Sequence, residues 1–162
     1  MKFVVQVPPA RAPEEATGAE IFINNAYRDS QQLKLFHALK DKVGSIVVMG
    51  SVSRHYPELI PTDYVHDKQA LAEACRLESI NPDGIPVLHL DLGFLEGTEI
   101  DDNEPTAFKS DYNTPLEDIV ETIIFWARTP TIRQVEFKWQ LTPFVKSELE
   151  RINPNVDFSR VE

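Results

Sequence analysis

The clearest pattern of apolar and polar positions lies in the first third of the chain, where the apolar period changes twice. Residues 21–23 are an apolar run that ends at Asn24 and Asn25, which is typical of a strand followed by a turn. Ser30 is a suitable N-cap, and apolar residues then recur at spacings of three and four. This spacing predicts a helix over residues 30–43.

A second strand is predicted directly after that helix. Gly44 is interpreted as the left-handed residue that ends the helix, and residues 46–49 form the next apolar run. A strand, a helix and a strand in so few residues favour two parallel strands joined by a right-handed crossover.

Three further segments alternate between apolar and polar residues and predict strands at residues 2–7, 85–92 and 133–141. In the second of these, His89 and Asp91 share one face and leucines occupy the other. We interpret the polar faces as exposed to solvent. A strand with one wet face is typical of an antiparallel sheet that is covered on one side only.

Further helices are predicted at residues 67–78, 114–128 and 142–152, because apolar residues recur there at helical spacing. Asp67 is a suitable N-cap for the first of them. Strong turn-forming residues follow residue 80, so an alternative is that residues 76–80 form one strand of a hairpin.

Together these elements predict a single α+β domain over residues 1–162. Its expected architecture is a two-layer mixed sheet of about five strands, with the helices mainly on one face. An open α/β sheet with helices on both faces, in three layers, is the alternative. A proline-rich arm at 8–19 and a long acidic loop at 93–113 complete the chain.

The net charge of the protein limits the classes of partner that it is expected to bind. The formal net charge of -10 would repel nucleic acid and anionic membranes, so neither is expected, and a protein partner with a basic surface is favoured. A homo-oligomer is a further expectation. The single cysteine indicates a reducing compartment, and the first apolar run is too short for a signal peptide or a membrane span. We therefore expect a cytoplasmic protein, or one that acts inside a host cell.

Two groups of histidine and carboxylate side chains are candidates for a catalytic or metal-binding site. His89 and Asp91 project from one strand face and could hold a proton or a metal, although a solvent-facing strand is the favoured interpretation. His66 and Asp67, with His55 and Asp91, resemble the ligand set of a helical metal-dependent phosphohydrolase. These residues fall on different kinds of element, so no metal is expected.

Acidic side chains in the long loop offer oxygen ligands but lack the spacing and the turn glycine of a calcium loop. We interpret them as a solvated docking site. The residues concerned are Glu99, Asp101, Asp102 and Glu104.

One arrangement has the character of an enzyme. The order of strand, polar loop containing Arg28 and Asp29, helix, and a later helix carrying Glu73 and Cys75 faintly resembles TIR-type domains, some of which cleave NAD. The resemblance implies that Arg28 and Glu73 belong to a nucleotide site. It contains no diagnostic motif and covers at most the middle half of the chain.

The favoured function is therefore a non-enzymatic protein-protein interaction protein. It would be a component of a larger assembly, including a viral one, or an acidic inhibitor or immunity-type protein, and no cofactor is expected. The alternative is a TIR-like nucleotide-binding or NAD-cleaving enzyme with Arg28 and Glu73 as catalytic residues. In either case the turn that holds Asn24, Asn25, Arg28 and Asp29 is a candidate binding site, because it follows a strand and precedes a helix.

Overall fold

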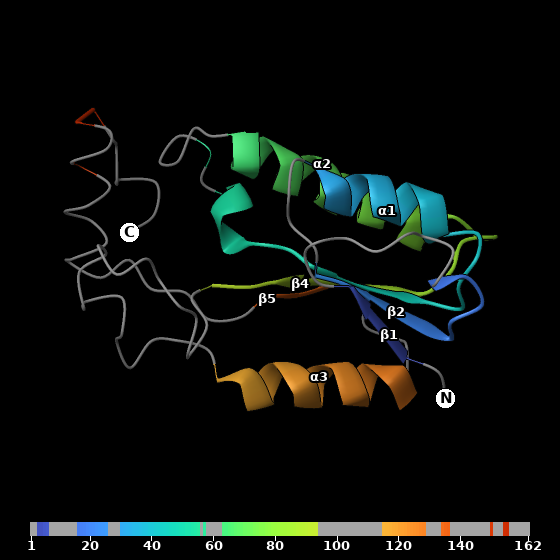
Figure 1. Cartoon of the computed structure of the whole chain (residues 1–162). Coiled ribbons are helices and arrows are strands. Elements are labelled where there is room, and N and C mark those ends of the chain that lie inside the picture. Colours follow the sequence, from blue (N-terminus) through green and yellow to red (C-terminus); the bar gives the residue numbers. More distant parts are fainter. Residues whose placement is uncertain are drawn as a thin grey trace.

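The computed structural model of the chain (Figure 1) describes residues 3–6, 16–25, 30–55, 57, 63–93, 115–128, 134–136, 150, 154 and 155. Its strands are β1 (Phe3–Gln6), β2 (Ile21–Asn24), β3 (Ile46–Met49), β4 (Val87–Asp91) and β5 (Gln134–Glu136). Its helices are α1 (Gln31–Leu39), the 3-10 helix η2 (Val52–His55), α2 (Asp63–Ile80) and α3 (Leu116–Arg128).

The sheet has the strand order β1-β2-β3-β4-β5, and every neighbouring pair is parallel. The expected mixture of α and β structure is confirmed, whereas the expectation of a mixed sheet is wrong. Helices α1, α2 and α3 each lie between two successive strands in the chain. A connection of that kind returns the chain to the starting edge of the sheet, so the next strand runs in the same direction.

Helices cover both faces of this sheet, as Figure 1 shows: α1 and α2 lie on one face and α3 on the other. The arrangement matches the alternative of an open α/β sheet rather than helices mainly on one face. Because the strand order advances in one direction, the crossover through α3 has the opposite hand to those through α1 and α2. Crossovers in proteins are nearly always right-handed, so at least one of the connections through these three helices has the less common hand.

Successive strand residues supply two separate apolar cores, because they point to opposite faces of the sheet. On the first face, Phe22, Ile46, Val48 and Val87 pack with α1 and α2. On the second face, residues that alternate with these pack against α3, and they include Ile21, Val47, Leu88 and Leu90. The period of two in the sequence thus encodes a two-sided sheet.

Two details around α1 differ from expectation. Ser30 is at the N-cap position, but it has a left-handed backbone with φ of 60°, and its side chain makes no capping hydrogen bond. Gly44 does not have a positive φ. A Cβ at Gly44 would lie 2.7 Å from the carbonyl oxygen of Glu20, so glycine is needed there for close backbone approach.

Helix α2 is longer than predicted at both ends. It begins at Asp63, so Asp67 lies within the helix and is not its N-cap. An acidic residue in the first turn suits the positive end of the helix dipole, and Asp63 meets that preference. The helix continues through Ile80, which excludes a hairpin strand over residues 76–80. No helix in the described part of the chain is both long and apolar enough to span a membrane.

Candidate ligand site at the carboxyl ends of the strands

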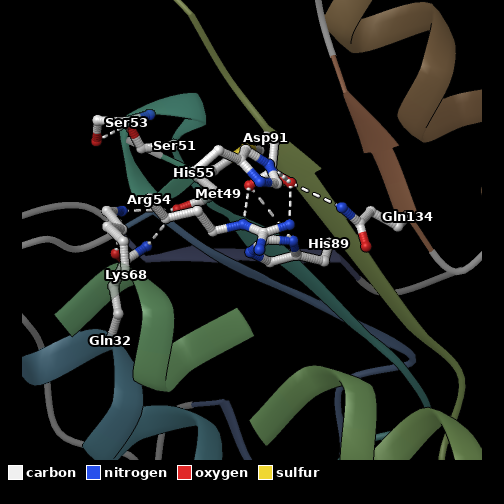
Figure 2. Close-up of polar contacts among 10 residues, drawn as sticks. All are labelled: Gln32, Met49, Ser51, Ser53, Arg54, His55, Lys68, His89, Asp91 and Gln134. Carbon is white, nitrogen blue, oxygen red and sulfur yellow. Dashed lines mark hydrogen bonds and ion pairs between the residues drawn. The ribbon is translucent and has the colours of Figure 1, made fainter. Parts of the chain in front are cut away.

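Polar side chains gather at the edge of the sheet where the parallel strands end. In open α/β sheets, ligands bind in this position, outside the carboxyl ends of the strands. Figure 2 shows the group, which we call the strand-end cluster. It consists of Gln32, Arg54, His55, Lys68, His89, Asp91 and Gln134.

Asp91 is the centre of the strand-end cluster. It ends β4 and is 0% exposed. Arg54 donates from Nε to Oδ1 at 2.8 Å and from Nη2 to Oδ2 at 2.6 Å. Gln134, on β5, donates from Nε2 to Oδ2 at 2.8 Å. The two-pronged contact balances the carboxylate charge and fixes the plane of the guanidinium group.

Two histidines approach the same carboxylate (Figure 2). Nδ1 of His89 lies 3.6 Å from Oδ1 of Asp91, and Nε2 of His55 lies 3.5 Å from Oδ2. Burial lowers the pKa of His89 to about 4, although the negative charge of Asp91 acts in the opposite direction. His89 is therefore neutral at neutral pH. Its Nε2 atom is buried and has no hydrogen-bond partner within the described ranges.

His89 packs against the backbone of Gly50, just after β3. A Cβ at Gly50 would lie 2.6 Å from Cε1 of His89 and 2.9 Å from Oδ1 of Asp91. Real Cβ atoms do not approach other heavy atoms this closely, so the position requires a glycine. The backbone at the end of β3 and the cluster on β4 are consequently in direct contact.

Lys68 is a second, deeply buried cation. It is 4% exposed, and its Nζ donates to Oε1 of Gln32 at 2.5 Å and to the Met49 carbonyl at 2.8 Å. Nζ also lies 5.4 Å from the centre of the Tyr64 ring. Burial lowers the pKa of Lys68 to about 8, against the opposing effects of Asp91 and Asp67. Lys68 thus places a readily deprotonated amine at the end of β3.

Asn24, a binding residue expected from the sequence, lies beside this lysine. It is 0% exposed, and its Nδ2 donates to the carbonyl of Gln32 at 2.8 Å. In return, Nε2 of Gln32 donates to the carbonyl of Asn24 at 3.0 Å. The buried Oδ1 of Asn24 has no hydrogen-bond partner in the described part of the structure. Asn25 is exposed, while Arg28 and Asp29 lie outside the described residues.

The other sequence candidates are elsewhere. Glu73 is on the exposed side of α2, where its carboxylate accepts two hydrogen bonds of 2.7 Å from Arg76. Cys75 is a buried core residue, and burial raises its thiol pKa to about 12. Asp67 accepts a hydrogen bond of 2.8 Å from the Ser30 hydroxyl. The acidic residues of the long loop, Glu99, Asp101, Asp102 and Glu104, lie outside the described residues.

The sequence pattern correctly places His89 and Asp91 on one strand face, but the expectation that this face is wet is wrong. Both side chains are buried, at 3% and 0% exposed. Sequence reasoning missed Arg54, Lys68 and Gln134. Lys68 carried a signal, because it falls three residues before Leu71 and so continues the buried stripe of α2.

The strand-end cluster combines two cationic side chains, Arg54 and Lys68, with the buried carboxylate of Asp91 and with neutral polar groups at the carboxyl ends of the strands. Among the described residues, no group of three or more histidine, cysteine or acidic side chains has an arrangement that could hold a metal ion. Comparison with protein-family models and with curated proteins finds no match to this chain.

Proposed function

We propose that this protein binds a small anionic molecule, of the class of phosphate-bearing nucleotides, at the strand-end cluster. The observation that carries the proposal is the convergence of Arg54 and Lys68 with His89 and Asp91 beside the carboxyl ends of β3 and β4. Buried ionisable groups with shifted pKa values concentrate at functional sites. Here they occupy the ligand-binding edge of a parallel sheet.

Charge around Lys68 supports an anionic ligand. Lys68 donates hydrogen bonds to Gln32 and to the Met49 carbonyl, and the effect of burial on its pKa outweighs the opposing charges of Asp91 and Asp67. A buried cation is stabilised by a nearby anion, which restores part of the interaction lost on leaving water. A bound anion should therefore raise the pKa of Lys68 above about 8. Binding should take up protons near that pH.

The test is ligand-dependent stability of the whole chain. ATP, NAD and inorganic phosphate are added separately, and the melting temperature is measured. A ligand at a hundred times its Kd stabilises by about 2.7 kcal/mol. For a chain of this size that amounts to a shift of roughly 5 to 10 °C. Isothermal titration in buffers of different ionisation enthalpy measures the proton uptake.

Two variants, each of which replaces one cationic side chain by methionine, show whether the shift in melting temperature depends on the proposed site. Lys68→Met removes the buried cation and should abolish the shift. Arg76→Met removes an exposed cation that contacts Glu73 on the outer side of α2, and it should leave the shift unchanged. Absence of any shift with all three ligands, or equal loss in both variants, refutes the proposed site.

The TIR-like alternative adds a catalytic step to nucleotide binding. It assigns Glu73 and Arg28 to NAD cleavage, and its support is the resemblance in the order of elements. Glu73→Gln should then abolish NAD cleavage while the fold stays intact. Wild-type protein that binds NAD and shows no turnover would remove this alternative and leave the binding proposal in place.

A second candidate function is protein-protein interaction. It is favoured by large apolar side chains that α3 exposes, including Leu116, Val120, Ile124 and Phe125, each at least 45% exposed. Contiguous exposed apolar surface is typical of interaction sites. Affinity capture with the tagged chain, followed by mass measurement of the complex, tests this function. A chain that stays monomeric and partner-free in its native extract contradicts it.

A further inference from the structure

Helix α3 has an apolar surface that is wider than the surface it buries. Ile119, Ile123 and Trp126 are buried against the sheet. Leu116, Val120 and Ile124 follow each other at a spacing of four and are 52%, 51% and 45% exposed. Residues at this spacing form one row along a helix, next to the buried row. The structure therefore buries only part of the apolar surface of α3.

The sheet beside α3 is also incompletely covered. Ile23, Met49 and Val135 belong to the core cluster on this face but are only partly buried. On the opposite face, the strand residues of the other core cluster are buried throughout. A helix is about 10 Å in diameter. The outer strands of a five-stranded sheet lie roughly 19 Å apart. Among the described elements α3 alone lies on this face (Figure 1), so the described part of the chain covers only part of the width of the sheet.

We infer that this surface, formed by the exposed row of α3 and the partly buried sheet residues beside it, docks a basic amphipathic helix of another protein. The inference rests on the second candidate function and specifies its partner. Glu117 and Glu121 are exposed and follow Leu116 and Val120 directly in the chain, so acidic side chains border the apolar row. A helix with leucines on one face and lysines at the border complements both features.

Charge also argues against a second copy of the chain as occupant. Symmetric pairing would bring the acidic borders of two α3 helices together, in a protein of formal net charge -10. An anionic membrane would be repelled for the same reason. The apolar row and its acidic border therefore select a basic protein segment.

The test uses a synthetic helical peptide with leucines at positions i, i+3, i+4 and i+7 and lysines elsewhere. A control peptide has the same composition in an order that has no apolar helical face. Binding to the full chain is measured by fluorescence anisotropy at several salt concentrations. We expect the amphipathic peptide to bind at least tenfold more tightly than the control, with affinity falling as salt rises.

Paired variants locate the surface. V120Q/I124Q should weaken binding at least tenfold, whereas L77Q/I80Q, which alters equally exposed apolar residues on α2, should not. Circular dichroism is used to check that both variants fold. Equal affinity for the two peptides, or equal loss in the two variants, overturns the inference, as does a wild-type dimer that V120Q/I124Q dissociates. A captured cellular complex that survives V120Q/I124Q overturns the docking surface while leaving the interaction function standing.

Discussion

Replacing Arg54 by methionine is the sharpest test of the strand-end cluster. Methionine keeps much of the volume of the arginine stem but removes the guanidinium group that binds Asp91 through two hydrogen bonds. The carboxylate of Asp91 is 0% exposed and cannot turn to water without movement of its surroundings. The variant therefore leaves a buried negative charge with its main partner removed.

The expected loss is large because of that burial. Breaking a buried ion pair by removing one partner costs about 3 to 5 kcal/mol. The Arg54 side chain is 16% exposed, so some water already reaches it, and the lower end of that range applies. About 3 kcal/mol corresponds to a fall in melting temperature of roughly 6 to 12 °C for a chain of this size.

Urea unfolding followed by circular dichroism measures the change in the free energy of unfolding, provided that the dependence on denaturant is unaltered. Arg76→Met is the matched control. Arg76 binds Glu73 with the same two-pronged geometry, but both side chains are more than half exposed. Exposed ion pairs contribute little to stability, so this variant should stay close to wild type.

A double variant separates the cost of the unpaired buried charge on Asp91 from the other effects of removing the Arg54 side chain. Asp91→Asn removes the charge that Arg54→Met leaves unpaired, so the double variant should be more stable than Arg54→Met alone. Suppose that Arg54→Met and Arg76→Met lower the free energy of unfolding equally, or that adding Asp91→Asn to Arg54→Met restores none of the loss. Burial of this ion pair is then not what stabilises the end of β4.

Three further predictions concern the same cluster. Because burial lowers the pKa of His89 from 6.5 to about 4, the unfolded chain binds a proton first as the pH falls. The free energy of unfolding should therefore decrease between pH 6.5 and 4 in urea titrations, and His89→Gln should flatten that decrease. For Lys68, whose pKa is lowered from 10.5 to about 8, the free energy of unfolding should rise as the pH rises from 8 to 10.5, and Lys68→Met should remove the rise. Gly50→Ala should cost about 1 to 3 kcal/mol by overpacking against His89 and Asp91, measured by urea unfolding; an unchanged midpoint would contradict the close contact.

The sequence predicts the central elements well because their signals are local. The apolar runs at β2 and β3 and the helical spacing of α1 each lie within one short segment, and the structure has these elements. The predicted first strand is also found, as β1 at one edge of the sheet. The architecture was misjudged because an exposed polar strand face was taken as evidence of an antiparallel sheet. Gln134 on β5 is exposed as expected, but it also donates a hydrogen bond to the buried Asp91, and β5 runs parallel to β4.

The candidate site was harder to predict because it depends on contacts between distant segments. Arg54 and Asp91 are 37 residues apart, as are Ser30 and Asp67. The periodicity of a single segment does not reveal that a charged residue is buried by an ion-pair partner from another segment. Polar residues at the end of a strand are equally consistent with exposure to solvent and with a buried ion pair. The positions of the neighbouring strand and helix are needed to decide between the two.

Strand β4 links the two surfaces that carry the proposals. Its Leu88 and Leu90 point to the α3 face and are fully buried, and His89 and Asp91 point to the α1 and α2 face. The strand is thus held by apolar contacts on one side and presents the charged cluster on the other. Because a ligand at the cluster and a helix beside α3 would contact opposite faces, their variants should act independently. Thermodynamic coupling between them would require β4 itself to shift.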